Sequence, residues 1–244
     1  MQQLTHEIRR AEFVDTGGGK RAFYVVPVGE GPFPSVLVFQ EAFGVNDYIQ
    51  GEAKRLGAHG YAAIAPDLFD GKTIAYDDQD GAFGMLKALT DDGMLDHTRA
   101  AMRFLDAQSE VRRERKGAVG FCMGGRLAFL TAVSEPGQIA AASSFYGGGI
   151  AAEQKRFFDP LLDRVPELRG ALLLIYGADD ESITPREHAR LAEALSTHKK
   201  RYCISVFPGA PHGFASRHRT AVYRPDDAEE AWAETFALFD RKLR

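Results

Sequence analysis

The sequence predicts an α/β fold with a mostly parallel central sheet, helices on both faces and an antiparallel hairpin at the N-terminus. From Ser35 onward, short apolar segments alternate with amphipathic segments, and turn or polar residues bound each apolar segment. This alternation is typical of parallel strands joined by right-handed helical crossovers. No repeat, low-complexity tract or flexible linker interrupts the pattern, so we expect residues 1–244 to form one domain.

The hairpin is predicted from two segments rich in β-branched and aromatic residues. HEIRRAEFV precedes the glycines at 17–19, which favour a turn, and RAFYVVPV follows them. Parallel strands are then expected in six segments: SVLVFQ, YAAIAPDL, GAVGF, IAAASSFYG, ALLLIYG and YCISVF. Helices are expected at 48–58, within 81–108, and at 125–133, 185–197 and 226–242. The last of these carries a stripe of Trp232, Phe236 and Phe239 at helical spacing.

Composition and charge narrow the classes of partner. The 244 residues carry a formal net charge of −4, which gives no overall attraction to nucleic acid or to anionic lipid. No apolar run is long enough to span a membrane, and the charged N-terminus lacks the apolar core of a signal peptide. We therefore expect a cytoplasmic protein that acts on a small molecule as a monomer or homodimer.

The histidines and cysteines show no metal-ligand spacing. Seven histidines are scattered along the chain, and there is no CxxC or HExxH motif, so neither a metal nor another cofactor is expected. The two cysteines lie in different contexts, which argues against a disulfide framework. Cys203 lies in the apolar strand segment RYCISVF without flanking glycines, and we expect it in the core.

The segment GFCMGG (residues 120–125) places Cys122 between a predicted strand and a predicted helix. Small residues two before and two after a nucleophile relieve crowding where a strand turns sharply into a helix, which exposes the side chain. The helix N-terminus would also favour a thiolate over a thiol. The alternative is a buried cysteine with glycines that serve helix packing.

A cysteine nucleophile needs a base and a group that orients the base, and later strand ends offer both. Asp179 and Asp180 follow ALLLIYG, and His212 follows YCISVF. Alone, either aspartate could be a turn residue and His212 an ordinary loop histidine. Together with Cys122 they give the order nucleophile, acid, histidine that is typical of α/β-hydrolases.

These motifs resemble those of the dienelactone hydrolase family of α/β-hydrolases. The matching segments are QEAFGVN (40–46), GFCMGG (120–125), GADDESI (177–183) and GAPHGF (209–214), followed by the aromatic C-terminal helix. The resemblance implies an α/β-hydrolase fold and a catalytic triad of Cys122, Asp180 and His212, so it selects Asp180 over Asp179. It also implies that Glu41 contacts the resting cysteine.

The mechanism implied by the resemblance is ester or lactone hydrolysis through a cysteine acyl-enzyme, with carboxymethylenebutenolide as the best-known substrate of the family. The oxyanion would be bound by the backbone N–H groups of Met123 and Ala42. Aromatic residues near the motifs are candidates for the substrate pocket. These candidates are Phe43, Tyr146 and Phe214.

The chain departs from the family pattern where an anionic lactone would bind. Family members that act on the acidic dienelactone have an arginine four residues after the histidine, where this chain has Ser216 with Arg217 beside it. A second arginine is expected before the nucleophile, but residues 71–93 contain none. Selectivity for a small anionic lactone therefore depends on whether Arg217 points into the site.

Two other functions compete with this interpretation. The same triad could hydrolyse other activated esters, such as aryl esters or organophosphates. A ligand sensor on the same fold is a third possibility, but such a protein would have no need of Cys122, Asp180 and His212 together.

Overall fold

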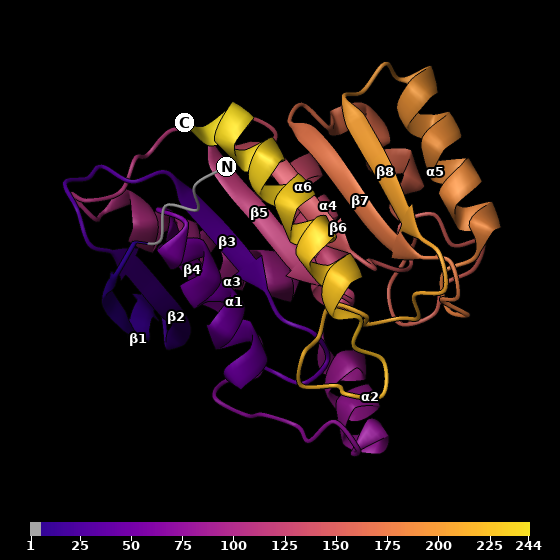
Figure 1. The fold of residues 1–244 in the computed structure, drawn as a ribbon, viewed down its shortest axis with the longest axis horizontal. Helices are drawn as coiled ribbons and strands as arrows, with labels where there is room; N and C mark the ends of the chain where they lie inside the picture. Colours follow the sequence, from indigo (N-terminus) through magenta and orange to yellow (C-terminus); the bar gives the residue numbers. More distant parts are fainter. Residues whose placement is uncertain (1–5) are drawn as a thin grey trace.

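The computed structural model describes residues 6–244, and these residues form an α/β fold around an eight-stranded sheet (Figure 1). The strand order from edge to edge is β1-β2-β4-β3-β5-β6-β7-β8. The strands are β1 (Ile8–Gly17), β2 (Lys20–Pro27), β3 (Ser35–Phe39), β4 (Ala62–Pro66), β5 (Lys116–Phe121), β6 (Ile139–Phe145), β7 (Ala171–Gly177) and β8 (Tyr202–Phe207). β2 pairs antiparallel with both β1 and β4, and the other neighbouring strands pair in parallel. The predicted hairpin and parallel sheet are thus confirmed.

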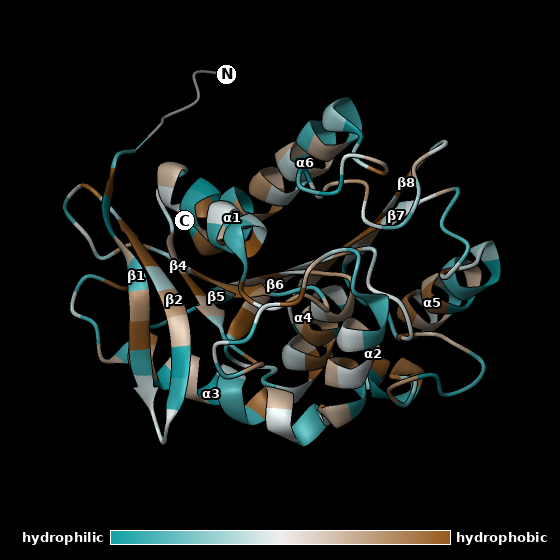
Figure 2. Cartoon of the chain, turned by 90° about the horizontal axis from the view of Figure 1, so that it is seen from below, coloured by the Kyte–Doolittle hydropathy of each residue, from teal (hydrophilic) through white to brown (hydrophobic). Residues whose placement is uncertain are grey.

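Helices cover both faces of the sheet, as predicted. Figure 2 shows α1 and α6 on one face and α3, α4 and α5 on the other. The helices are α1 (Asp47–Ala58), α2 (Gln79–Ala88), α3 (Asp91–Asp106), α4 (Met123–Ser134), α5 (Pro185–Thr197) and α6 (Pro225–Leu243), with a 3-10 helix η1 (Leu162–Glu167). β3, β4, β5 and β7 are buried along their whole length, because helices pack on both of their faces. Among these helices none has the length and apolar composition to cross a membrane.

The helical region expected within 81–108 consists of two helices rather than one long helix. Asp78 caps α2 by accepting a hydrogen bond from the Gly81 N–H. Thr90 caps α3 by accepting one from the Gly93 N–H. A threonine followed by two aspartates is itself a helix-start signal, because the side chains satisfy free N–H groups and the charges favour the helix N-terminus. The break lets α2 leave the face of the sheet.

The prediction that Cys203 lies in the core is wrong, because Cys203 is exposed. It belongs to β8, which is the edge strand of the sheet, and most side chains of this strand are only partly buried or exposed. An apolar segment alone does not distinguish an edge strand from a central one.

The parallel strands bring distant residues to one edge of the sheet. Glu41 follows β3, Cys122 follows β5, Asp180 follows β7 and His212 follows β8. The carboxyl ends of these strands meet at the same edge, where open α/β sheets bind ligands. α2 lies beyond this edge, on the side to which the arrows of β3 and β5 point (Figure 1).

Candidate active site

Cys122 occupies a sharp turn between β5 and α4. Its backbone has φ 56° and ψ −119°, a left-handed conformation that side-chain-bearing residues rarely adopt. Its N–H donates to the Phe145 carbonyl oxygen at 3.0 Å, and its own carbonyl oxygen accepts from the Gly125 N–H at 2.9 Å. These bonds hold the strained residue between the end of β6 and the first turn of α4.

Glycines on both sides make the turn possible. A Cβ atom at position 120 would lie 1.9 Å from the Gly124 carbonyl oxygen. One at position 124 would lie 2.3 Å from the Phe39 carbonyl oxygen, and one at 125 would lie 2.7 Å from that of Phe145. All three contacts are with backbone, which cannot swing away, so β5 and α4 pack this closely only with glycine at these positions.

The buried Asp180 and the partly buried His212 form a hydrogen-bonded pair. The Nδ1 atom of His212 lies 2.7 Å from the Asp180 Oδ2 atom, and the other Asp180 oxygen accepts from the Ser182 hydroxyl at 2.6 Å and from the Ser182 N–H at 2.8 Å. Burial favours a raised pKa for Asp180, but these hydrogen bonds and the charge of His212 bring its pKa below the ordinary value. The neighbouring Asp179 is exposed to solvent. Asp180 is therefore the aspartate that orients His212.

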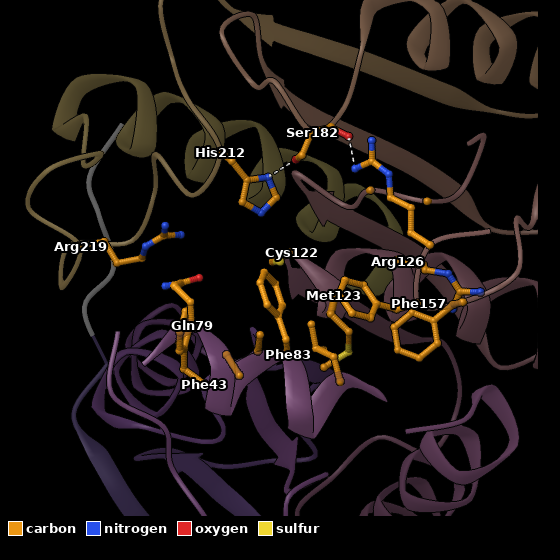
Figure 3. Close-up of a pocket in the computed structure, with 17 residues that line it drawn as sticks. Phe43, Gln79, Phe83, Cys122, Met123, Arg126, Phe157, Ser182, His212 and Arg219 are labelled. Carbon is orange, nitrogen blue, oxygen red and sulfur yellow. Dashed lines mark hydrogen bonds between the residues drawn. The ribbon is translucent and has the colours of Figure 1, made fainter. Parts of the chain in front are cut away.

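Cys122 and His212 line the same cavity (Figure 3). Burial alone would lower the pKa of His212, but the negative charge of the Cys122 sulfur and the hydrogen bond with Asp180 together raise it above its ordinary value. The arrangement favours the imidazolium form of His212 next to the Cys122 sulfur. A thiolate is the nucleophilic form of cysteine.

Glu41 is buried beside this pair without a hydrogen-bond partner for either carboxylate oxygen among residues 6–244. Only 1% of the surface of Glu41 is exposed to solvent. Burial raises the pKa of Glu41 to about 7, although the charges of Arg219 and His212 oppose this effect. The structure shows no hydrogen bond between Glu41 and Cys122 in the described part of the chain. It places Glu41 as a carboxyl group that can gain or lose a proton near neutral pH.

The backbone N–H groups of Ala42 and Met123 have no acceptor within the described residues. Both residues line the cavity, and Met123 is the first residue of α4. Helix N-termini leave such N–H groups free to bind an oxygen atom of a ligand. The two groups that the sequence analysis assigned to an oxyanion are thus present and unpaired.

The cavity has a volume of about 370 Å³ and is lined mainly by apolar side chains. Its lining comes from the loop after β3, α2, the start of α4 and the loop after β6. Ser182 from the loop after β7 and His212 and Arg219 from the segment before α6 complete it. This volume lies in the range of small-molecule sites. No group of three or more His, Cys, Asp or Glu side chains suited to a metal ion occurs in residues 6–244.

Only one of the candidate substrate-contacting side chains lines the cavity, and that is Phe43. Tyr146 and Phe214 are fully buried and pack behind the site, where the Tyr146 ring contacts the edge of the His212 ring at a centroid distance of 5.1 Å. Arg217 points elsewhere, with its guanidinium 3.7 Å from the buried carboxylate of Glu52. The structure therefore does not bring these three residues to the cavity.

Arg219 is the cation that the sequence analysis missed. It lines the cavity, its guanidinium lies over the Phe43 ring at 5.9 Å, and its charge acts on Glu41. Three arginines follow His212 within twelve residues, and nothing in their spacing marks the one that turns inward. The loop conformation decides this, and no periodic pattern encodes that conformation.

Comparison with known proteins identifies the family. The model of the dienelactone hydrolase family matches residues 21–243, which is nearly the whole chain. The chain belongs to the dienelactone hydrolase family. A relative from Synechocystis, which carries the provisional name carboxymethylenebutenolidase, is 31% identical over 224 residues that cover 89% of this chain and 90% of the relative. A relative from Bradyrhizobium, provisionally named a 2-oxo-3-(5-oxofuran-2-ylidene)propanoate lactonase, is 31% identical over 91% of this chain and 90% of its own length.

Solved structures agree with this dienelactone hydrolase assignment. A crystal structure of a Klebsiella pneumoniae protein, provisionally named a dienelactone hydrolase, superposes with a TM-score of 0.87 at 29% identity. The superposition covers 95% of this chain and 98% of that one. The α/β-hydrolase fold expected from the resemblance is confirmed.

The raised pKa of Glu41 predicts how pH changes stability. The folded protein binds the Glu41 proton more tightly than the unfolded chain, so ionisation of this group destabilises the fold as pH rises from about 4.5 to about 7. We compare the free energy of unfolding of Glu41→Gln with that of the unaltered protein at each pH. From about pH 5 to about pH 8 this difference should shift in favour of Glu41→Gln by up to about 3 kcal/mol, because only the unaltered protein has the buried carboxyl group that ionises. Urea unfolding at a series of pH values measures this difference.

The exposed Glu230 on α6 provides the control. Glu230→Gln should give a difference in free energy of unfolding that changes little over the same pH range. A difference for Glu41→Gln that is equally independent of pH would show that the Glu41 carboxyl group is not destabilised by burial.

Proposed function

We propose that this protein hydrolyses carboxylic esters or lactones through an acyl-enzyme formed on Cys122. The observation that carries the proposal is the position of Cys122 at a strained turn in the same cavity as His212, whose ring is held by Asp180 at 2.7 Å. A nucleophile, a base and a group that orients the base are the parts that acyl transfer requires. The names of the relatives, carboxymethylenebutenolidase and lactonase, support a lactone or ester as the substrate.

The first half of the reaction forms a thioester. The Cys122 thiolate attacks the carbonyl carbon, and the oxyanion of the tetrahedral intermediate accepts hydrogen bonds from the N–H groups of Met123 and Ala42. The intermediate collapses as the bond to the leaving oxygen breaks, and the His212 imidazolium gives that oxygen its proton. In a lactone this step opens the ring, so the leaving oxygen stays attached to the acyl group.

The second half returns the enzyme to its starting state. Neutral His212 takes a proton from water, and the resulting hydroxide attacks the thioester carbonyl through a second tetrahedral intermediate. The C–S bond then breaks, so the carboxylic acid product leaves behind the Cys122 thiolate and the His212 imidazolium. Asp180 keeps Nδ1 of His212 engaged throughout, so that Nε2 faces the reacting atoms.

Glu41 supports this cycle through its charge rather than through a bond to substrate. With a pKa near 7 and no hydrogen-bond partner among the described residues, it can hold a proton when the thiolate is present and limit the negative charge in the buried site. Arg219 offsets that charge when Glu41 is ionised.

The test of the nucleophile uses the two cysteines of the chain. We expect Cys122→Ala to lower kcat/KM for p-nitrophenyl acetate by about 1,000-fold or more, because the covalent route is lost. Cys203→Ala, which changes an exposed thiol on β8, should retain activity. Acid-quenched turnover mixtures, digested and analysed by mass spectrometry, should show an acetyl group on the Cys122 peptide.

Two outcomes would contradict the proposal. Near-normal turnover by Cys122→Ala would exclude the covalent mechanism on this residue. Saturable ester binding by the unaltered protein without hydrolysis or acetylation would favour a ligand sensor.

The neighbouring aspartates provide a matched test of the acid. Asp180→Asn removes the charge that orients His212, and we expect it to lower kcat/KM by about 1,000-fold. Asp179→Asn changes an exposed side chain one residue away and should have little effect. Steady-state hydrolysis of p-nitrophenyl acetate measures both, and equal effects of the two substitutions would show that Asp180 is not the orienting residue.

A further inference from the structure

Two large aromatic side chains at the cavity are exposed to solvent. Phe83 of α2 is 44% exposed and Phe157 of the loop after β6 is 37% exposed. Their rings stack with centroids 5.6 Å apart and planes 26° apart. Exposed phenylalanines occur singly in soluble proteins, but a stacked pair on the wall of a cavity is an apolar surface that a ligand can cover.

The wall around this pair is apolar along its length. Ala82 and Leu86 of α2, Met123 of α4 and Phe158 complete it. We call these residues, with Phe83 and Phe157, the aromatic wall.

The two arginines next to the aromatic wall are engaged by the protein. Arg126 is buried and binds both carboxylate oxygens of Asp91, at 2.6 and 2.9 Å, and its guanidinium also lies over the Phe158 ring. Arg156 donates to the Ser182 carbonyl oxygen at 3.0 Å. Asp91 therefore neutralises the buried Arg126, whereas Arg156 is exposed and bonds to a neutral carbonyl oxygen at the rim. Between these two arginines the aromatic wall presents ring faces.

The chemistry at Cys122 determines which part of a substrate meets this wall. The carbonyl oxygen must lie at the N–H groups of Met123 and Ala42, and the leaving oxygen must lie at His212. Figure 3 shows His212 on one side of Cys122, and Met123, Phe83 and Phe157 on the other. The remaining substituent of the carbonyl carbon, the acyl group, is the one directed to the aromatic wall.

We infer that the aromatic wall is an acyl pocket for a flat, apolar group such as an aryl ring, so that the preferred substrates are esters or lactones with such a group on the carbonyl side. This inference rests on the proposed hydrolysis at Cys122. The cavity volume of about 370 Å³ suits an acyl group much larger than acetyl. Phe83 and Phe157 then determine specificity by stacking on the bound ring.

The test compares two esters with the same leaving group. p-Nitrophenyl 3-phenylpropanoate and p-nitrophenyl acetate differ only in the acyl part, so the ratio of their kcat/KM values isolates acyl recognition. We expect the unaltered protein to prefer the arylacyl ester by on the order of 10-fold. Phe83→Ala and Phe157→Ala should each lower this ratio several-fold, on the order of 3- to 10-fold, and Phe157→Trp should retain it.

Phe13 offers a matched control, because it is an exposed phenylalanine on β1, outside the cavity lining. Phe13→Ala should leave the ratio unchanged, and thermal unfolding of each variant checks that it is folded. A ratio near one in the unaltered protein, or a ratio unaffected by Phe83→Ala and Phe157→Ala, would overturn the inference. Failure of the proposed function would look different, because neither ester would be hydrolysed and no acyl group would be found on Cys122.

Discussion

The backbone of Cys122 is left-handed, and the arrangement of the whole site depends on this one constraint. The conformation is unfavourable by itself and persists because the hydrogen bonds with Phe145 and Gly125 hold it in place. Glycines at 120, 124 and 125 allow the backbones of β5, α4 and the neighbouring strand ends to touch. The turn lifts the sulfur above the edge of the sheet and brings α4 with its free N–H groups to the same place.

The two buried acids of the site, Asp180 and Glu41, differ in their hydrogen-bond partners, and this difference sets their pKa values apart. Asp180 has a partner for each oxygen, His212 for one and Ser182 for the other, so it remains charged. Glu41 has no such partner in the described chain, so burial dominates and raises its pKa to about 7. The separation of the two pKa values means that one carboxylate can fix the histidine while the other changes its protonation near neutral pH.

The sequence allowed the fold to be predicted well and the walls of the cavity poorly, for a physical reason. The strands, the hairpin and the helices follow from hydrophobic period and turn chemistry, which are local properties. The motif residues Cys122, Asp180 and His212 lie directly after strands whose ends must meet. Arg219 and Phe157 lie in irregular segments, where the direction of a side chain depends on tertiary packing. The same limit explains why the burial of Cys203 was predicted wrongly, because an apolar segment does not reveal whether its strand lies at the edge or in the centre of the sheet. It also explains Arg217, which turns to the buried Glu52 rather than to the cavity.

The proposed mechanism requires His212 to hold Cys122 as a reactive thiolate, and the rates at which iodoacetamide alkylates the two cysteines test this requirement directly. Cys203 is exposed and Cys122 only partly so, which makes Cys203 an internal reference within each sample. At about pH 6 an ordinary thiol is almost entirely protonated and reacts slowly. We expect Cys122 to be alkylated faster than Cys203 at this pH, and we expect His212→Asn to remove this difference in rate. Slower alkylation of Cys122 than of Cys203 in the unaltered protein, or a ratio of rates that His212→Asn does not change, would contradict the proposed mechanism.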